Sequence, residues 1–351
     1  MSKLKIGYWP LSSNLKSAGD RRRVIFWAQA RGHEIVTDLS KRVDVIIASE
    51  KSDFGSVAFT KPKAPVVFDL IDGYLSPLNP YDDLARGLAK SLSGQISGKV
   101  KPFSHHVKDF CHSAEAVICS SVEQEKLIKP YNLNTQVILD SHDEIPFIET
   151  KPLLAKSLIE YRILWEGQPA TIRGVRQISS TLTQLTRANT LHFDFVTDRN
   201  YFQFLGKYIK RSTLNLLKND LGEAFDRARI TPWTASNLLE CAKRSDIAMI
   251  PIDLSIPMQK LKPENRLLIM WRLGLPCLTS SSPAYIRVAL EAGTKTVCET
   301  SQIWLESFNH LLFDPVFAHE ELLRGQNYLR ENHTRAILLD KWDRAIESVM
   351  S

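Results

Sequence analysis

Three polar residues near position 265 have types and a spacing that could bind phosphate. Lys262, Asn265 and Arg266 lie close together around Pro263. Proline favours the first turn of a helix, because its missing N–H would have no partner there. The free amides of such a helix start carry partial positive charge, to which two cations and an amide donor add. The pattern therefore predicts a phosphate or diphosphate site, with a solvated helix start that binds nothing as the alternative.

Two carboxylates and one imidazole are candidates for acid–base chemistry. Asp69 and Asp72 stand at the end of the apolar run 65–72, which predicts a buried strand. Open α/β sheets bind ligands beyond the carboxyl ends of their strands. Asp72, followed by the flexible Gly73, is therefore our first candidate for a general base, and His142 is the second. A helix cap or a loop hydrogen bond would explain either aspartate without chemistry.

The predicted phosphate site is positioned by a strand, a helix and a second strand. Residues 246–253 form a β-branched and apolar run with a proline near its end, which predicts a buried parallel strand. Its last residue, Asp253, should face a ligand crevice. The helix that follows is apolar nearly all round and ends at Gly274, and Leu275-Pro276 opens the next strand.

Length and composition limit the class of protein. A chain of 351 residues exceeds the usual size of one core and predicts two domains. No apolar run approaches the roughly 18 residues that cross a bilayer. Because the amino end passes directly into a strand without a signal-peptide core, we expect a cytosolic protein. The five cysteines are odd in number and lack paired spacing, which argues against disulfides and against a zinc site.

The net charge of +6 indicates an anionic partner, which could be nucleic acid, a membrane surface or a phosphorylated substrate. The densest basic groups are 21–23 and 207–218, and neither has the aromatic spacing of an RNA-binding motif. The sequence therefore disfavours nucleic acid as the partner.

Hydrophobic patterns divide the chain into two runs of alternating strands and helices. The first run predicts strands at 5–9, 33–38, 43–49, 65–72, 116–120 and 135–140 and helices at 19–32, 80–92, 101–113 and 122–131. A proline-flanked polar stretch near 145–160 then separates the runs. The second run predicts strands at 162–167, 191–197, 246–253, 275–280 and 296–299 and helices at 175–185, 207–217, 235–245, 263–273, 301–313, 316–331 and 334–349.

The order of strand DIAMIPID, helix KPENRLLIMWRLG and GLPCLTSSSPAY resembles the nucleotide-sugar half of glycosyltransferases with the GT-B fold. Within that fold it resembles the family 4-like transferases of bacterial glycan assembly, and the likeness extends over most of the chain. The resemblance implies an α/β protein with two Rossmann-like, doubly wound domains facing an interdomain cleft. The implied parts are an acceptor-binding domain at 1–150, a nucleotide-sugar-binding domain at 151–333 and a terminal helix at 334–351 that crosses back to the first domain.

The resemblance also implies site residues and ligands. The implied donor-binding residues are Gly167, Arg173, Trp233, Asp253, Lys262, Asn265 and Arg266. The implied acceptor-side residues are Gly19, Arg21, Arg22 and Asp69. Trp233 could instead pack in the core. Arg21 and Arg22 could instead lie on the solvent-exposed face of a capped helix. The implied ligands are a nucleotide sugar and a glycan or lipid-linked acceptor, with no cofactor or metal; a peripheral contact with the inner membrane face stays open.

The chain departs from the family pattern at one point. Many retaining GT-B enzymes carry two glutamates eight positions apart, and Leu261 and Ile269 occupy those positions here, with Glu264 out of register. The stereochemistry of a hexosyltransferase-like reaction is therefore undecided. No phosphate-binding-loop, dinucleotide or Gly-x-Ser-x-Gly motif is present, which favours sugar transfer. The alternatives are a non-transferring relative, such as an epimerase or a phosphorylase, and a degenerate subunit that binds a partner transferase.

Overall fold

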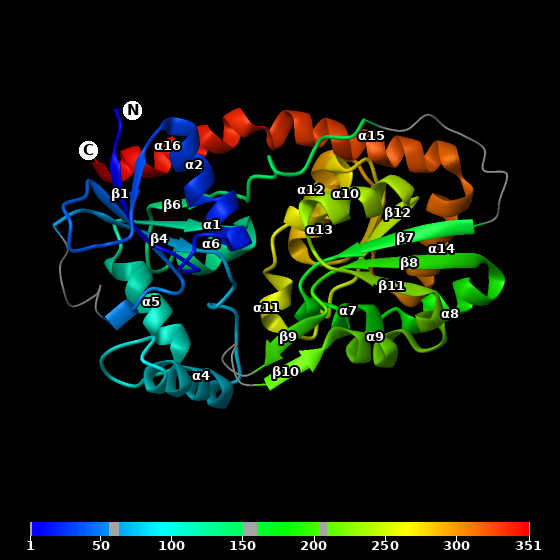
Figure 1. Cartoon of the computed structure of the whole chain (residues 1–351), viewed down its shortest axis with the longest axis horizontal. Helices are drawn as coiled ribbons and strands as arrows, with labels where there is room; N and C mark the ends of the chain where they lie inside the picture. The colour runs from blue at the N-terminus through cyan, green and yellow to red at the C-terminus, as the bar shows by residue number, and fades with distance from the viewer. Residues whose placement is uncertain (1, 56–62, 150–159, 204–208, 351) are drawn as a thin grey trace. The chain divides into compact units, whose positions relative to one another are not determined.

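A computed structural model describes residues 2–55, 63–149, 160–203 and 209–350 of the chain (Figure 1). The chain divides into two compact units. Unit 1 comprises Met1–Asp143, Pro257–Pro263 and Thr334–Ser351, and unit 2 comprises Glu144–Ile256 and Glu264–His333. The domain boundary predicted between residues 150 and 151 lies outside the described residues.

Unit 1 is built on a parallel sheet of six strands in the order β2-β1-β3-β4-β5-β6. The strands are β1 (Lys5–Trp9), β2 (Glu34–Val36), β3 (Val45–Ser49), β4 (Val66–Leu70), β5 (Ala116–Cys119) and β6 (Thr135–Val137). The helices are α1 (Ala18–Arg22), α2 (Val24–Arg31), α4 (Pro80–Leu92), α5 (Phe103–Ser113), α6 (Val122–Ile128), α11 (Pro257–Lys260) and α16 (Arg335–Met350). The strand order reverses between β1 and β3, and such switch points are where doubly wound sheets bind ligands.

Both faces of this sheet are buried, which explains the unbroken apolar runs of its strands. Neighbouring residues of β3 point to opposite faces: Ile47 packs in the core formed with α2 and α16, whereas Ile46 packs in the core formed with α5. Helix α16 is held on the first face by Trp342, which stacks on Trp27 at 5.6 Å between ring centroids. The indole N–H of Trp27 also donates to Asp343 at 2.8 Å.

Unit 2 has its own parallel sheet of six strands in the order β11-β8-β7-β12-β13-β14, which reverses between β7 and β12. The strands are β7 (Glu160–Glu166), β8 (Thr190–Val196), β11 (Ala228–Thr231), β12 (Ile247–Ile250), β13 (Cys277–Ser280) and β14 (Val297–Cys298), and β9 (Asn200–Gln203) pairs antiparallel with β10 (Ile209–Ser212). The α-helices are α7 (Arg173–Arg176), α8 (Ser179–Ala188), α9 (Thr213–Leu221), α10 (Ala235–Arg244), α12 (Asn265–Arg272), α13 (Pro283–Ala292), α14 (Ser301–Phe313) and α15 (Pro315–Asn332). One face of the sheet packs on α8, α9 and α14.

Most predicted elements are present within a few residues of their expected bounds, and α4 has the bounds predicted for it. The expected helix at 207–217 is wrong for 209–212, which form the exposed strand β10; residues 207 and 208 lie outside the described residues. A helix begins only at Thr213, where the hydroxyl of Ser212 caps the amide of Asn215. None of the helices in the described residues is long and apolar enough to cross a membrane.

Candidate functional site

The carboxyl ends of β7 and β12 meet at the switch point of the unit 2 sheet. Strand β7 ends at Glu166 and is followed by Gly167. A Cβ atom at Gly167 would lie 3.1 Å from the guanidinium carbon of Arg266 and 3.0 Å from the hydroxyl of Thr171. A side chain here would therefore push against Arg266 and Thr171. The sequence prediction placed Gly167 and Arg266 on the donor side, and the structure brings these two residues together.

Arg266 is fixed at the switch point by three groups. Its guanidinium donates to the carbonyl of Glu166, its Nε lies 3.7 Å from the Glu166 carboxylate, and its Cζ lies 4.9 Å from the ring centroid of Trp165. The side chain keeps a small exposed fraction of 19%. An arginine held in this way presents a fixed positive charge without losing further side-chain entropy on binding an anion.

Glu166 connects Arg266 to Trp233, which the sequence placed beside a nucleotide base. The indole N–H of Trp233 donates to the Glu166 carboxylate at 2.8 Å. Glu166 itself is buried, so both of its neighbours are held by a carboxylate that is shielded from water. The sequence prediction missed Glu166; its signal was an acidic residue at the end of an apolar strand, directly before a glycine.

Helix α7 approaches the end of β12 more closely than a side chain would permit. A Cβ atom at Gly174 would lie 2.2 Å from the carbonyl oxygen of Pro251. This approach brings the exposed Arg173 to the end of β12. Asp253 uses one carboxylate oxygen within its own turn, accepting from the amide of Ser255 at 3.1 Å and from its hydroxyl at 2.6 Å.

Helix α12 begins at Asn265, two residues later than the prediction from Pro263. The preceding residue, Glu264, does not cap the helix. Its carboxylate instead accepts from Arg287, at 3.0 and 3.1 Å. The amides of the first turn therefore have no side-chain cap, as an anion site at a helix start requires. Asn265 lies in this first turn.

Lys262 belongs to unit 1, whereas Arg266 belongs to unit 2. The ammonium of Lys262 forms an ion pair with Asp72 at 2.7 Å. In the same segment, the side chain of Leu261 packs over Gly73. A Cβ atom at Gly73 would lie 2.8 Å from the Leu261 side chain. The predicted base and one predicted phosphate ligand are therefore partners in this structure, a pairing that the sequence did not indicate.

A second carboxylate stands beside Asp72. Glu50 directly follows β3 at the switch point of the unit 1 sheet, and its carboxylate accepts from the amide of Asp72 at 3.0 Å. The hydroxyl of Tyr74 also forms a hydrogen bond with Glu50. Sequence reasoning missed Glu50, although an acid at the end of the apolar run VDVIIASE was the same signal that selected Asp72.

The pKa values of Glu50 and Asp72 are shifted in opposite directions. Burial raises the pKa of Glu50 to about 7, and the nearby Asp72 carboxylate adds to the increase. Burial also acts to raise the pKa of Asp72, but the charge and hydrogen bond of Lys262, together with the charges of Lys51 and Arg86, hold that pKa below its usual value. The surroundings therefore favour the ionised form of Asp72 and the protonated form of Glu50.

Basic side chains surround these two acids. Arg86 lies over the ring of Tyr74, with its Cζ 5.7 Å from the ring centroid, and Lys51 directly follows Glu50 in the chain. Burial lowers the pKa of Lys90 to about 8, and Lys51 contributes to the decrease. A cluster with two acids and several cations, one of each with a pKa near neutrality, is typical of a functional site.

Asp69 does not join this cluster. It is buried, and both of its oxygens bind Arg23. The acceptor-side role predicted for Asp69 does not fit this position, because its oxygens are committed within the core. Sequence position had suggested a free carboxylate at the end of β4, but only the fold shows that an arginine 46 residues away reaches it.

The remaining acceptor-side residues lie in α1, with Gly19 near its start and Arg21 and Arg22 at its end. Gly19 permits close packing, since a Cβ atom there would lie 2.3 Å from the side chain of Leu11. Arg21 is partly exposed and donates to the carbonyl of Lys16 at 3.0 Å. Arg22 is buried, and its carbonyl accepts from the amide of Ser141 at 2.7 Å.

His142, the second candidate base, is also in unit 1. Only 1% of its surface is exposed. A base must reach the hydroxyl that it deprotonates, so the partly exposed Asp72 has the better position of the two.

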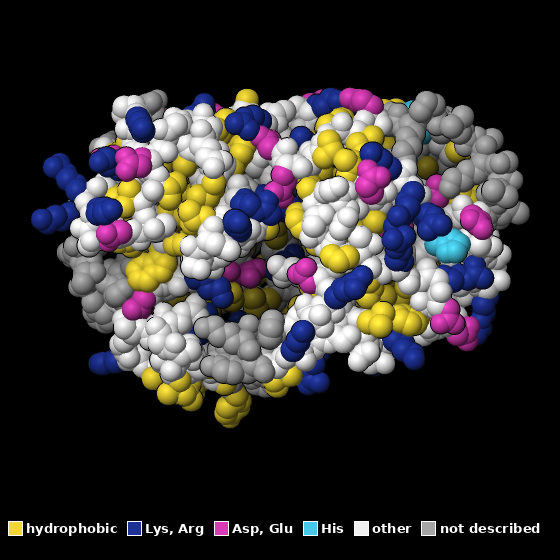
Figure 2. Space-filling model, in the orientation of Figure 1, with side chains coloured by type: hydrophobic (Ala, Val, Ile, Leu, Met, Phe, Trp, Pro, Cys, Tyr) yellow, Lys and Arg dark blue, Asp and Glu magenta, His cyan; other side chains and the backbone are white. Residues whose placement is uncertain are grey.

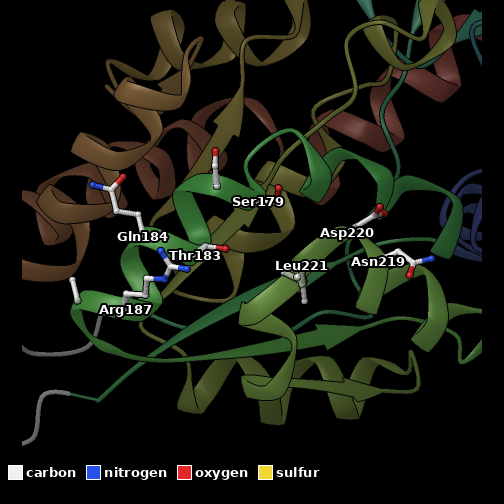
Figure 3. A pocket seen from close by; sticks show the side chains of 10 residues that line it. Ser179, Thr183, Gln184, Arg187, Asn219, Asp220 and Leu221 are labelled. Carbon is white, nitrogen blue, oxygen red and sulfur yellow. The ribbon is translucent and has the colours of Figure 1, made fainter.

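A polar pocket of about 790 Å³ lies elsewhere in unit 2, between α8 and the end of α9 (Figure 3). Its lining includes Ser179, Thr183 and Gln184 from α8 and Asp220 from α9. Burial raises the pKa of Asp220, against the opposing effect of Arg176 and Arg173. None of the residues predicted to bind the donor lines this pocket.

Comparison with known proteins identifies the architecture. No protein-family model matches the chain, and no curated protein matches it either. Among solved structures, Anabaena HepE in complex with UDP-glucose aligns at a TM-score of 0.67 and 12% identity, over 98% of this chain and 100% of HepE. The chain has the GT-B fold.

Two further GT-B structures align in the same way. WaaG, a glycosyltransferase involved in lipopolysaccharide biosynthesis, gives a TM-score of 0.60 at 12% identity, over 98% of this chain and 99% of WaaG. TarM gives 0.58 at 10% identity over 86% of this chain, which spans about half of TarM, 54% of its length. At these identities the likeness establishes the GT-B fold and leaves function to the chemistry of the residues.

Proposed function

We propose that this protein is a glycosyltransferase that moves a sugar from a nucleotide-sugar donor to a hydroxyl of a glycan or lipid-linked acceptor. The observation that carries the proposal is the switch point of unit 2, where the fixed cation of Arg266 packs against the backbone of Gly167 at the end of β7. A diphosphate leaving group needs such a cation together with uncapped helix amides. The similarity to HepE, which binds UDP-glucose, supports a uridine nucleotide as the first donor to test.

On the donor side, Arg266, Arg173 and the amides of Asn265 and its neighbours would bind the diphosphate. Trp233, held by Glu166, would flank the base. These groups supply positive charge without a metal or a cofactor, so the proposed reaction needs neither. A thermal-shift screen over nucleotides and nucleotide sugars tests the proposal; absence of any shift with every nucleotide would count against it.

Replacing Arg266 by alanine should weaken binding of UDP and UDP-glucose by about tenfold or more, because charge-assisted contacts contribute roughly 1.5 to 3 kcal/mol. Isothermal titration calorimetry measures the effect. The matched control is Arg227→Ala, which removes an exposed arginine of unit 2 outside the site and should leave affinity unchanged. Equal affinities of the wild type and Arg266→Ala would exclude Arg266 from the donor site.

On the acceptor side, we propose that Asp72 is the general base and that Glu50 is a positioning residue. Asp72 is the more exposed of the two acids, so it is the one that can reach an acceptor hydroxyl. Glu50 holds the backbone of Asp72 through its amide. When Glu50 ionises, its negative charge makes Asp72 a stronger base.

Glu50→Gln should therefore change the pH profile of turnover. In the wild type, we expect the rate to rise with pH as Glu50 ionises near pH 7. The rate of the variant should not show this rise near pH 7, because glutamine keeps an acceptor for the Asp72 amide but has no titrating group. An unchanged profile would remove Glu50 from the proposal.

The same substitution should also alter the pH dependence of stability, which does not require activity. The pKa of Glu50 is raised from 4.5 to about 7 in the folded chain, so the folded state keeps a proton that the unfolded state releases. Its contribution to stability is complete below pH 4.5 and is lost as pH rises through 7. Thermal unfolding should show a smaller loss of stability between pH 5 and pH 8 for Glu50→Gln than for the wild type.

We further propose that the protein works in the cytosol. The support is chemical: all five cysteines are buried free thiols, as expected in a reducing compartment.

A further inference from the structure

Helix α4 in unit 1 exposes its apolar side, and two of its charged residues, Asp83 and Lys90, are buried on the opposite side. Tyr81, Leu84, Leu88 and Leu92 are exposed by 83%, 46%, 44% and 80%. At about 100° per residue, these four side chains fall within an arc of about 80°. A helix on a soluble protein normally directs this arc to the core. Figure 2 shows hydrophobic side chains protruding where Figure 1 places α4.

The opposite side of α4 carries the charges. Asp83 is buried and accepts from the amide and the hydroxyl of Ser104, at 2.9 and 2.5 Å. Lys90 is also buried, with its ammonium 4.5 Å from the ring centroid of Phe103. These contacts fix the rotation of the helix, so the apolar arc cannot turn inward without breaking them.

The segment after α4 adds a basic edge to this arc. A Cβ atom at Gly87 would lie 2.0 Å from the carbonyl oxygen of Lys101, so the backbone of the segment runs against the helix. Val100 and Lys99, the two exposed residues before Lys101, therefore lie close to the helix in the chain that runs against it. An apolar face bordered by lysine is typical of a helix that lies in a membrane interface.

The size of the apolar face favours a lipid bilayer over a protein partner as its occupant. Helix α4 has 13 residues and is therefore about 20 Å long. A face about 10 Å wide covers roughly 200 Å², well below the roughly 800 Å² per partner of a stable protein interface. A lipid bilayer needs no complementary partner surface, and the net charge of +6 favours an anionic one.

We infer that α4 docks the protein on an anionic membrane surface, with Leu84, Leu88 and Leu92 inserted among the acyl chains. Tyr81 would lie at the level of the headgroups, and Lys99 would contact their phosphates. This inference does not depend on the sugar-transfer chemistry, although a lipid-linked acceptor would be presented at such a surface.

Vesicle flotation with the full chain tests the inference. The wild type should float with vesicles of phosphatidylcholine and phosphatidylglycerol, and more weakly with phosphatidylcholine alone. Leu88→Gln/Leu92→Gln should lower partitioning by about tenfold or more, because two inserted leucines are lost. Lys99→Gln should lower partitioning to the anionic vesicles by about fivefold, the effect of one lysine near the surface.

The matched control is Leu133→Gln/Leu290→Gln, which replaces two leucines that are exposed by 87% and 77% elsewhere on the chain. This control should float like the wild type. Thermal unfolding, measured in every variant, reports on folding without relying on the proposed donor site, and UDP binding reports separately on that site. The inference is overturned if the wild type does not float, or if the α4 variant floats as well as the control. It is also overturned if sedimentation equilibrium shows a wild-type dimer that the α4 variant abolishes, since a second copy would then be the occupant.

Discussion

Asp72→Asn should lower turnover by roughly a hundredfold or more while leaving nucleotide affinity unchanged. Asparagine keeps the shape of the side chain and removes its basicity, and loss of a general base typically costs that much. The ion pair with Lys262 at 2.7 Å is also lost, but it is partly exposed and contributes little to stability. Turnover is measured as release of UDP from the donor in the presence of acceptor, and affinity by calorimetry.

Two comparisons make this result specific. Asp340→Asn removes an exposed carboxylate that pairs with Arg344 on α16, and it should leave turnover unchanged. His142→Ala tests the second candidate base. If His142→Ala abolishes turnover and Asp72→Asn retains it, the base lies in the turn after β6. If neither variant loses activity, a dedicated base at these positions is wrong, and a retaining mechanism becomes the better account.

Arg23→Met should destabilise the protein by about 3 to 5 kcal/mol, the usual cost of leaving a buried charge without its partner. Arg23 is fully buried between α1 and α2, and it donates to Asp69 at 2.6 Å and to the carbonyl of Ile138 at 2.6 Å. Removing the guanidinium leaves the buried carboxylate of Asp69 and this carbonyl without their donor. Urea unfolding of the full chain measures the change.

An exposed arginine provides the control for this prediction. Arg31→Met breaks the pair with Asp343 at 2.5 Å, where the arginine is 38% exposed, and should cost no more than about 1 kcal/mol. The double variant Arg23→Met/Asp69→Leu should recover part of the loss, because it removes both buried charges. Equal unfolding midpoints for Arg23→Met and Arg31→Met would show that the buried pair contributes no more to the free energy of unfolding than the exposed pair.

The sequence was sufficient to identify the type of fold and to select two residues of the proposed donor site. Apolar runs of four to eight residues indicate buried parallel strands, and a helical period of apolar residues indicates an amphipathic helix. Both signals are local, so β12 and α4 could be recognised from them. The glycine at 167 and the basic residue at 266 were also identified, because each stands next to a recognisable strand or helix end.

Partners of charged side chains could not be identified in the same way, because they depend on which strands become neighbours. Lys262 reaches Asp72 across 190 residues of sequence, and Arg23 reaches Asp69 across 46. Glu50 became relevant only once β3 and β4 lay side by side and placed its carboxylate against the amide of Asp72.

The same limit applies to helix α4. Its periodic sequence determines that it is an amphipathic helix, but periodicity alone cannot tell which side is covered. The tertiary structure decides this through the contacts of Asp83 with Ser104 and of Lys90 with the ring of Phe103, which bury the charged side and leave the leucines in solvent. Sequence thus determined the elements of this protein, whereas long-range packing decided which of their side chains meet each other and which face water.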